Sequence, residues 1–425
     1  MHFEIVIAVV ITFVATGLLW LFVVNVSVGE KKITEPLRPD FSVGDNEFLR
    51  VMGGLLGPGI IQGNEVKALL NGDQIFPAML DAIANAKQTI CFETYIYWSG
   101  EIGERFSHLL SERAKAGVKV HVLLDWAGSC KIDEHYLEEM RKAGVEVERF
   151  HPLRWFTLSR LNNRTHRKLL IVDGKIGFTG GVGISDKWTG HAQDEDHWRD
   201  SHFQIEGPSV TQMQAAFIDN WIKVRGCVLH QEIYFPKIEP AGSVRAQVFK
   251  SSRDEGSESV RLMYLLSIAA AQKSVRLSAS YFVPDTLALK TLVQAEKRGV
   301  NIEIIVPGPN IDSSVVRRAS RARWGDLLDA GIAIYEFQPT MYHCKILIVD
   351  DVWVSVGSTN FDNRSFRLNA EANLNILDRE FALEQARTFE ADKARSHRMT
   401  REEYDHRPLR EKAIEHLAEL FRSQL

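Results

Sequence analysis

The sequence has few of the residues that metal centres and disulfide frameworks use. Its four cysteines are scattered through 425 residues and form neither a Cys-x-x-Cys pair nor a recognisable zinc set. No cluster of carboxylates stands out with the spacing of metal ligands. Such scattered cysteines favour a reduced compartment. They are Cys91, Cys130, Cys227 and Cys344.

An excess of one charge is also missing. The chain has 51 lysines and arginines against 55 aspartates and glutamates, which gives a net charge of −4. This balance produces no overall field for gripping a polyanion, so we expect no nucleic-acid partner. With 45% hydrophobic and 25% charged residues, the composition is that of a folded enzyme with room for two domain-sized cores.

Charged residues are absent from Ile5 to Val28, a run long enough to cross a bilayer as a helix. A secretory signal peptide would begin with a basic region and have a shorter apolar core. No lysine or arginine precedes the run, whereas Lys31, Lys32 and Arg38 follow it. The positive-inside tendency therefore predicts a single-pass protein of the cytoplasmic membrane, with the catalytic bulk on the cytoplasmic side.

One string of residues occurs twice in the rest of the chain. In each copy a His-x-Lys triplet is followed, at the same spacing, by an aspartate and then by a glycine-containing turn. A histidine can attack or protonate, a lysine can neutralise a phosphate, and a glycine turn lets the backbone approach an anion. Two half-sites suggest one composite active site. The copies are His166, Lys168, Asp173, Gly180 and Gly181, and then His343, Lys345, Asp350, Gly357, Ser358 and Asn360.

The duplication extends beyond these motifs, because three more segments recur in the same order. Short β-branched runs alternate with helical stretches in both halves, which predicts α/β layers with a mostly parallel or mixed sheet. The recurring segments are 87–97 with 273–282, 116–125 with 298–307, and 143–150 with 330–337.

The spacing inside each motif can be interpreted physically. Side chains alternate between the faces of a strand, so the histidine and lysine of one motif point the same way and can reach one phosphate. Asp173 and Asp350 lie an odd number of residues from their histidines and next to turns. We list them with the catalytic motif but expect a supporting role, such as holding the turn.

A catalytic imidazole usually needs a carboxylate that fixes its tautomer. Asp200 and Glu371 are our candidates, because each precedes an alternating, strand-like segment at a corresponding place in its half. The alternative for either residue is an exposed carboxylate at the end of a strand.

The doubled string resembles the signature of the phospholipase D superfamily, and the chain looks like the bacterial cardiolipin synthases over about residues 62–425. The resemblance implies two tandem α/β repeats that form a pseudo-twofold bilobal domain. Gly183 departs from the pattern, since the family usually has asparagine there, and one phosphate donor is then missing. Segments that carry the closer resemblance are Phe92–Tyr97, Trp198–His202, Tyr281–Asp285, Tyr335–Pro339 and Gly357–Phe366.

We therefore predict four parts of the chain. They are a transmembrane anchor at 1–30, a juxtamembrane linker at 31–61, a first repeat at 62–240 and a second repeat at 241–425.

What the resemblance implies is a ping-pong transfer that needs no metal and no cofactor. One histidine attacks phosphorus to form a phosphatidyl-histidine, while the other protonates the departing alcohol and later activates the incoming one. We favour His166 as the nucleophile. Lys168 and Lys345, with Ser358 and Asn360, would hold the phosphate oxygens. In cardiolipin synthases both donor and acceptor are phosphatidylglycerol, and glycerol is released.

Two other functions stay open at this point. A hydrolytic phospholipase D or a nuclease of the same superfamily would use water in place of the lipid alcohol, although the charge balance and the apolar run argue against a nuclease. A non-catalytic membrane scaffold that binds anionic phospholipid is the other, and both intact histidine-lysine pairs argue against it.

Three more stretches are candidates for lipid contact. The basic run Arg317–Trp324 could bind anionic headgroups or be a solvated helix face. The segment Glu411–Leu425 has apolar residues at helical spacing, and we expect it to dock on its own domain. The segment Pro152–Thr165 has no counterpart in the second half and is a candidate lid.

Overall fold

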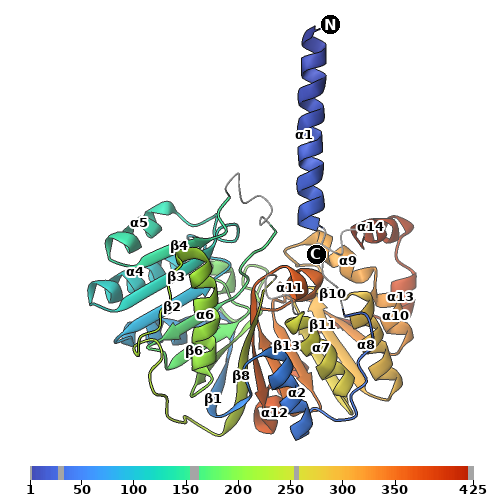
Figure 1. The fold of residues 1–425 in the computed structure, drawn as a ribbon. Helices are drawn as coiled ribbons and strands as arrows, with labels where there is room; N and C mark the ends of the chain where they lie inside the picture. The colour runs from blue at the N-terminus through green and yellow to red at the C-terminus, as the bar shows by residue number, and fades with distance from the viewer. Residues whose placement is uncertain (1, 27–32, 154–161, 253–257, 420–425) are drawn as a thin grey trace.

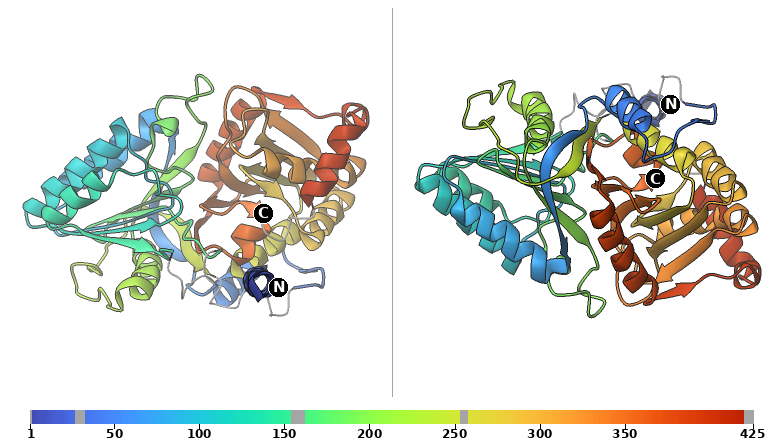
Figure 2. Two further views of the ribbon diagram at one scale, coloured as in Figure 1. Left: turned by 90° about the horizontal axis from the view of Figure 1, so that it is seen from above. Right: turned by 90° about the horizontal axis from the view of Figure 1, so that it is seen from below.

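The computed structural model describes residues 2–26, 33–153, 162–252 and 258–419. Two lobes lie side by side, and helix α1 (His2–Val26) projects away from them (Figure 1). One lobe contains the first repeat and the other the second, as the views from above and below show (Figure 2). The bilobal α/β architecture predicted from the duplicated sequence is confirmed.

A mixed sheet of 15 strands runs through both lobes, in the order β17-β12-β11-β9-β13-β14-β16-β8-β1-β7-β6-β5-β2-β3-β4. The first half supplies β1 (Ile61–Leu70), β2 (Thr89–Thr94), β3 (Lys119–Asp125), β4 (Glu146–Phe150), β5 (Leu169–Val172), β6 (Ile176–Gly180) and β7 (Ser201–Glu206). The second half supplies β8 (Val244–Ser251), β9 (Ser274–Ala279), β11 (Asn301–Pro307), β12 (Ala333–Phe337), β13 (Lys345–Val349), β14 (Trp353–Gly357), β16 (Glu371–Leu377) and β17 (Ser396–Arg398). A separate two-stranded sheet joins β10 (Phe282–Val283) and β15 (Phe361–Asp362).

The two halves of the large sheet have the same internal pairing. In the first, β2, β3 and β4 are parallel, and β2, β5, β6, β7 and β1 follow one another antiparallel. In the second, β9, β11 and β12 are parallel, and β9, β13, β14, β16 and β8 follow antiparallel. The antiparallel pair β1 and β8 joins them. The pseudo-twofold relation therefore holds for these strands, and the second half adds the edge strand β17, which pairs antiparallel with β12.

Four glycines mark equivalent helix-to-strand junctions. Gly117, Gly144, Gly299 and Gly331 adopt φ values of +93°, +97°, +93° and +97°, which L-residues with a side chain rarely adopt. Each follows the last turn of a helix and precedes a strand of the sheet, as expected of a helix-terminating glycine. The repeated glycine junctions in the sequence thus have a physical cause. The helices are α4 (Glu101–Lys115), α5 (Glu134–Lys142), α8 (Thr286–Lys297) and α10 (Trp324–Asp329).

Helices cover both faces of each half-sheet and create three main apolar cores. One core lies in the first lobe, under α3 (Asn71–Asn85), α4 and α5. Another lies in the second lobe, under α7 (Ser259–Ala270) and α8. The third contains residues of both halves, including Trp221 of α6 (Val210–Arg225) and Phe389 of α12 (Arg379–Lys393). This shared core holds the lobes together.

Short backbone bridges also cross between the lobes next to the two motifs. Thr165 pairs with Ala370, and Arg199 pairs with Tyr342, both in parallel. As part of these bridges, the amide of His166 donates to the carbonyl of Ala370 at 2.9 Å. The amide of His343 likewise donates to the carbonyl of Arg199 at 2.7 Å. Each motif therefore enters its strand while attached to the opposite half.

The segment that we expected to be a juxtamembrane linker is folded onto the second half. It contains α2 (Asn46–Leu56), whose buried Phe48 and Met52 belong to the apolar core under α7. The Phe48 ring meets the ring of Trp353 edge-on, with centroids 5.0 Å apart. The buried residues of this short helix, Phe48, Met52 and Leu56, follow one another at four-residue spacing and so lie on one face.

We predict that truncating the buried face of α2 destabilises the second half. Phe48→Ala removes a fully buried ring and should lower the free energy of unfolding by about 3–5 kcal/mol. Leu55→Ala on the same helix is the control, because Leu55 is 52% exposed and should cost less than about 1 kcal/mol. Urea unfolding of the full-length protein in detergent measures both. Equal losses would mean that α2 does not pack as described.

Candidate active site

The two His-x-Lys motifs lie at the start of equivalent strands, at the seam between the lobes. His166 and Lys168 directly precede β5, while His343 lies two residues before Lys345, the first residue of β13. All four residues are buried, with exposed fractions of 9%, 3%, 7% and 3%. Each lysine ammonium donates to the carbonyl of its own histidine, at 2.8 and 2.7 Å. Each motif is therefore a compact pair of one imidazole and one cation.

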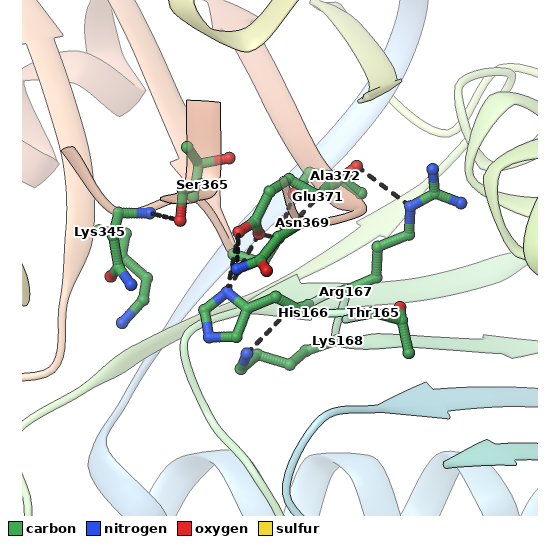
Figure 3. A network of polar contacts seen from close by, with 12 residues as sticks. Thr165, His166, Arg167, Lys168, Lys345, Ser365, Asn369, Glu371 and Ala372 are labelled. Carbon is green, nitrogen blue, oxygen red and sulfur yellow. Dashed lines mark hydrogen bonds and ion pairs between the residues drawn. The ribbon is translucent and has the colours of Figure 1, made fainter. Parts of the chain in front are cut away.

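The carboxylate that holds each imidazole comes from the other half of the chain. Nδ1 of His166 lies 3.1 Å from both carboxylate oxygens of Glu371, which begins β16 (Figure 3). Nδ1 of His343 lies 2.7 Å from Oδ2 of Asp200, which directly precedes β7. The sequence identifies both carboxylates as candidates. It does not reveal that they cross over, because the pairing depends on how the lobes meet.

Other buried groups hold the two carboxylates in place. The hydroxyl of Ser358 donates to Oε2 of Glu371, and Nδ2 of Asn369 lies 3.4 Å from Oε1. On the other side, the indole Nε1 of Trp188 donates to Oδ2 of Asp200 at 2.9 Å. Sequence reasoning did not assign these roles to Asn369 and Trp188. Their only local signal is that each lies within a dozen residues of its carboxylate.

Both imidazoles are neutral in the substrate-free protein. Burial, opposed by Glu371, lowers the pKa of His166 to about 4. Burial and the charge of Lys345 lower the pKa of His343 to about 3. Burial would raise the pKa of either carboxyl, but the imidazole contacts outweigh it and the net pKa of both Glu371 and Asp200 is lowered. Ionised carboxylates thus accept from Nδ1–H, which leaves the lone pair of Nε2 as the basic or nucleophilic position of each ring. Nε2 of His343 lies 3.2 Å from the ammonium of Lys345.

The two lysines form a site that favours an anion. Burial and the charge of Lys345 lower the pKa of Lys168 to about 7. Burial likewise lowers the pKa of Lys345. An anion between them would relieve both effects, since opposite charge favours the ammonium form. Across the described residues, no group of three or more His, Cys, Asp and Glu side chains could hold a metal ion.

The glycine turns of the two halves do different things. An added Cβ on Gly181 would lie 2.3 Å from Oδ1 of Asp200, so glycine is needed there to make room for the carboxylate. Gly183 stands in place of the family's asparagine. A Cβ added at this position would lie 2.8 Å from Cβ of Ile96, so the Ile96 side chain occupies the space that a side chain at position 183 would need. The equivalent positions in the second half carry Ser358 and Asn360, both buried. Ser358 already donates its hydroxyl to Glu371, so the side-chain amide of Asn360 is the candidate donor to a phosphate at these positions.

The motif aspartates lie at turns and bind backbone. The carboxylate of Asp173 accepts from the amides of residues 87, 88 and 89, at 2.7 to 2.9 Å. The carboxylate of Asp350 accepts in the same way from residues 272, 273 and 274. Their φ values are +52° and +54°, a conformation that aspartate tolerates better than most residues. Their place in the structure fits a turn-holding role and gives no reason to assign them to the chemistry.

The middle residue of the first motif points away from the site and braces it. The guanidinium of Arg167 is fully buried and donates through Nε to the carbonyl of Glu371 at 3.1 Å (Figure 3). It also lies 3.2 Å from a carboxylate oxygen of Asp219 on α6. Arg167 therefore links the first motif, the shared core and the carboxylate of the opposite half.

Two of the three stretches that we considered for lipid contact instead make contacts with other parts of the protein. In the basic run, Arg317, Arg321 and Arg323 form ion pairs with Glu336, Glu415 and Glu419. The last two acids belong to α14 (Leu409–Glu419), which docks on α9 (Ser314–Arg321) as we expected of a terminal helix. Most of the segment Pro152–Thr165 lies outside the described residues.

Comparison with known proteins identifies relatives of the whole catalytic region. The family model described as cardiolipin synthase, phospholipase D-like domain, matches residues 79–221 and 264–393. The major cardiolipin synthase ClsA of Bacillus subtilis is 35% identical over 351 residues, covering 82% of this chain and 73% of the relative. Cardiolipin synthase 1 of Bacillus cereus is 34% identical over 396 residues, covering 91% of this chain and 77% of the relative.

Among solved structures, the phosphatidylserine synthase of Haemophilus influenzae has a similar fold. It superposes with a TM-score of 0.69 and covers 90% of this chain and all of its own, at 15% sequence identity. At that identity the likeness concerns the fold alone.

We predict that a third buried histidine makes stability depend on pH. Burial lowers the pKa of His202 to about 4, whereas an unfolded histidine titrates near 6.5. The stability that neutral His202 contributes is therefore complete above about pH 6.5 and is lost as the pH falls toward 4. His202→Asn introduces the residue found at the equivalent position, Asn373, opposite the motif glycine of β14.

This variant should flatten the dependence of the unfolding free energy on pH between 6.5 and 4 by up to one proton, or about 1.4 kcal/mol per pH unit. Urea unfolding at a series of pH values measures it. His108→Asn is the control, because the side chain of His108 is 79% exposed and should leave the slope unchanged. An unchanged slope in His202→Asn would contradict the prediction.

Proposed function

Because the chain belongs to the cardiolipin synthase family with phospholipase D-like domains, we propose that it makes cardiolipin from two molecules of phosphatidylglycerol. It transfers the phosphatidyl group of one molecule to the other and releases glycerol. The observation that carries this proposal is the pair of histidine-lysine motifs, each with its imidazole held by a carboxylate of the other half. A scaffold without catalysis would not need two oriented, neutral imidazoles.

In the first step, Nε2 of His166 attacks the phosphorus of the donor lipid. The bond from phosphorus to the glycerol oxygen breaks, and a phosphatidyl-histidine forms. His343 gives its proton to the departing glycerol. That proton is disfavoured in the empty site, but the phosphate anion raises the pKa of an imidazole that faces it.

In the second step, neutral His343 takes the proton from a hydroxyl of the incoming phosphatidylglycerol. The resulting oxygen nucleophile attacks phosphorus, the bond to His166 breaks, and cardiolipin leaves. One imidazole thus serves as acid and then as base, which lets the same geometry serve both steps. Glu371 and Asp200 keep the two rings oriented and stabilise their charged forms.

The phosphate oxygens are held by cations and donors that are already in place. Lys168 and Lys345 supply the charge, and Asn360 supplies a polar side chain, while Ser358 donates to Glu371 and holds that carboxylate. Preorganised groups of this kind stabilise the charge that develops in the transition state. Gly181 and Gly183 make no matching contribution, so phosphate binding is one-sided.

We further propose that the body is held at the membrane with its site facing the lipid. Helix α1 is long and apolar enough to span a bilayer, by length and composition. The described chain resumes at Ile33, seven residues after Val26, and so within about 25 Å of the end of α1. The amide of Ile33 donates to Glu258, and Glu258 accepts from Arg367 at 2.7 Å.

This attachment is close to the candidate phosphate donors. Arg367 ends helix α11 (Asn363–Arg367), and Ser365 of the same helix accepts from the amide of Asn360 at 3.2 Å. The anchor is therefore fastened to the element that carries one wall of the site. Lys31, Lys32 and Arg38 follow the span, which supports a body on the cytoplasmic side.

We predict that His166→Ala and His343→Ala each abolish transfer, and that an activated donor separates their roles. In phosphatidyl-p-nitrophenol the leaving phenolate needs no proton. This donor should restore a burst of nitrophenol in His343→Ala, whereas His166→Ala should show none. The reverse pattern would make His343 the nucleophile, and normal turnover of either variant would exclude the two-histidine mechanism. His108→Ala, an exposed histidine, is the control.

We expect purified protein in mixed micelles with EDTA to convert labelled phosphatidylglycerol into cardiolipin and glycerol. The activity should persist with EDTA, because the proposed transfer uses only protein side chains. Product analysis distinguishes the alternatives. Phosphatidic acid alone would indicate a hydrolytic phospholipase D, and no lipid product would favour a nuclease or a scaffold.

The orientation can be tested with the protein's own thiols. Cys130 and Cys227 are exposed, whereas Cys91 and Cys344 are buried. A membrane-impermeant maleimide should label the body only after the cells are lysed. Phe3→Cys in a Cys130→Ser, Cys227→Ser background is the matched control and should be labelled in intact cells, because residue 3 then lies on the outer side. Labelling of the natural thiols in intact cells would invert the orientation.

A further inference from the structure

A tyrosine-carboxylate pair stands beside the second motif and has no role in the chemistry described above. The hydroxyl of Tyr281 lies 2.8 Å from Oδ1 and 3.0 Å from Oδ2 of Asp312. Tyr281 is half-buried, and Asp312 is exposed on the loop between β11 and α9. A carboxylate that accepts one hydrogen bond from a tyrosine hydroxyl still has lone pairs that can accept others.

The backbone ties Tyr281 to both functional segments of the second half. The amide of the preceding residue, Ser280, donates to the carbonyl of Cys344 at 3.0 Å, inside the His-x-Lys motif. The carbonyl of Tyr281 accepts from the amide of Phe361 at 3.0 Å, directly after the phosphate-binding Asn360. The backbone of Tyr281 therefore lies between the His-x-Lys motif and Asn360.

The charge of Lys345 acts on Asp312. Partial desolvation by the surrounding chain raises the pKa of the Asp312 carboxyl, while the Tyr281 hydroxyl and the charge of Lys345 act in the opposite direction. The equivalent tyrosine of the first half, Tyr95, is used differently. Its ring meets the imidazole of His166 edge-on at 5.2 Å, and the ammonium of Lys168 lies 5.7 Å from its centre.

The two sides of the site thus offer different chemistry. The His166 side presents an aromatic face, and the His343 side presents a carboxylate with an oriented phenol. A carboxylate accepts hydrogen bonds from alcohol hydroxyls and repels a second anion. A neutral polyol suits this position, because the charge of Lys345, which acts on Asp312, disfavours a cationic headgroup.

We propose that Tyr281 and Asp312 bind the free hydroxyls of a polyol headgroup and hold its reacting oxygen at His343. The inference rests on the proposed function, in which His343 protonates the departing glycerol and activates the incoming one. It adds a specificity determinant: this pair recognises the hydroxyls beside the reacting oxygen of the glycerol headgroup, by hydrogen bonds that a simple alcohol cannot make.

The test is a competition between two acceptors. The full-length protein in micelles receives phosphatidyl-p-nitrophenol together with glycerol and 1-propanol, which lacks the second and third hydroxyls. The ratio of phosphatidylglycerol to phosphatidylpropanol gives the ratio of kcat/KM for the two alcohols. In Tyr281→Phe and in Asp312→Ala this ratio should fall about tenfold, as for the loss of a hydrogen bond to a charged group.

A remote pair of the same kind supplies matched controls. The hydroxyl of Tyr335 donates to Oε1 of Glu303 at 3.3 Å on the outer strands β11 and β12. Tyr335→Phe and Glu303→Ala remove the same groups and should leave the ratio unchanged.

Two results would overturn the inference alone. An unchanged ratio in both test variants would show that the pair does not contact the alcohol. Equal loss of both products would show that the pair only fastens the loop that carries Asp312. If the unaltered protein forms neither product, the proposed function itself fails and the inference falls with it.

Discussion

The crossing of each carboxylate to the opposite imidazole is the constraint on which the site depends. Glu371 belongs to the second half and orients His166, while Asp200 belongs to the first and orients His343. Neither half alone can therefore form an imidazole–carboxylate pair. The backbone bridges at Thr165 and Arg199 and the shared apolar core fix the spacing that these bonds need. The contacts that stabilise the seam therefore also set the geometry of the catalytic side chains.

Duplication produced two similar halves, but their turns differ where it matters for an anion. The shorter Asp200 carboxylate fits only because Gly181 has no side chain, whereas Ser358 at the equivalent place donates to the longer Glu371. Ile96 occupies the space that a side chain at position 183 would need. A pseudo-twofold site thus becomes directional. Under the proposed function the polar side-chain donor to the phosphate lies on one side, which suits a reaction whose two histidines have different roles.

Much of this could be predicted from the sequence because it depends on local patterns. The alternation of strands and helices within each half and the doubled motif leave periodic or spaced signals. The fold of residues 33–61 could not be predicted in this way, because α2 is defined by its packing on the second half. The same holds for Trp188 and Arg167. Their roles come from long-range contacts that no spacing in the sequence encodes.

Burial keeps the two catalytic histidines neutral in the empty site, and a bound phosphate would favour the protonated form that the proposed first step needs. Burial holds both imidazoles neutral, and burial with the charge of Lys345 lowers the pKa of Lys168, so the empty site lacks the proton that a departing alcohol needs. A phosphodiester between the lysines supplies the missing negative charge and favours protonation of the imidazole that faces it. Under the proposed function that anion arrives on acyl chains that avoid water. Under the same proposal, attachment through α1 keeps the site beside the phospholipid whose phosphodiester favours the protonated imidazole.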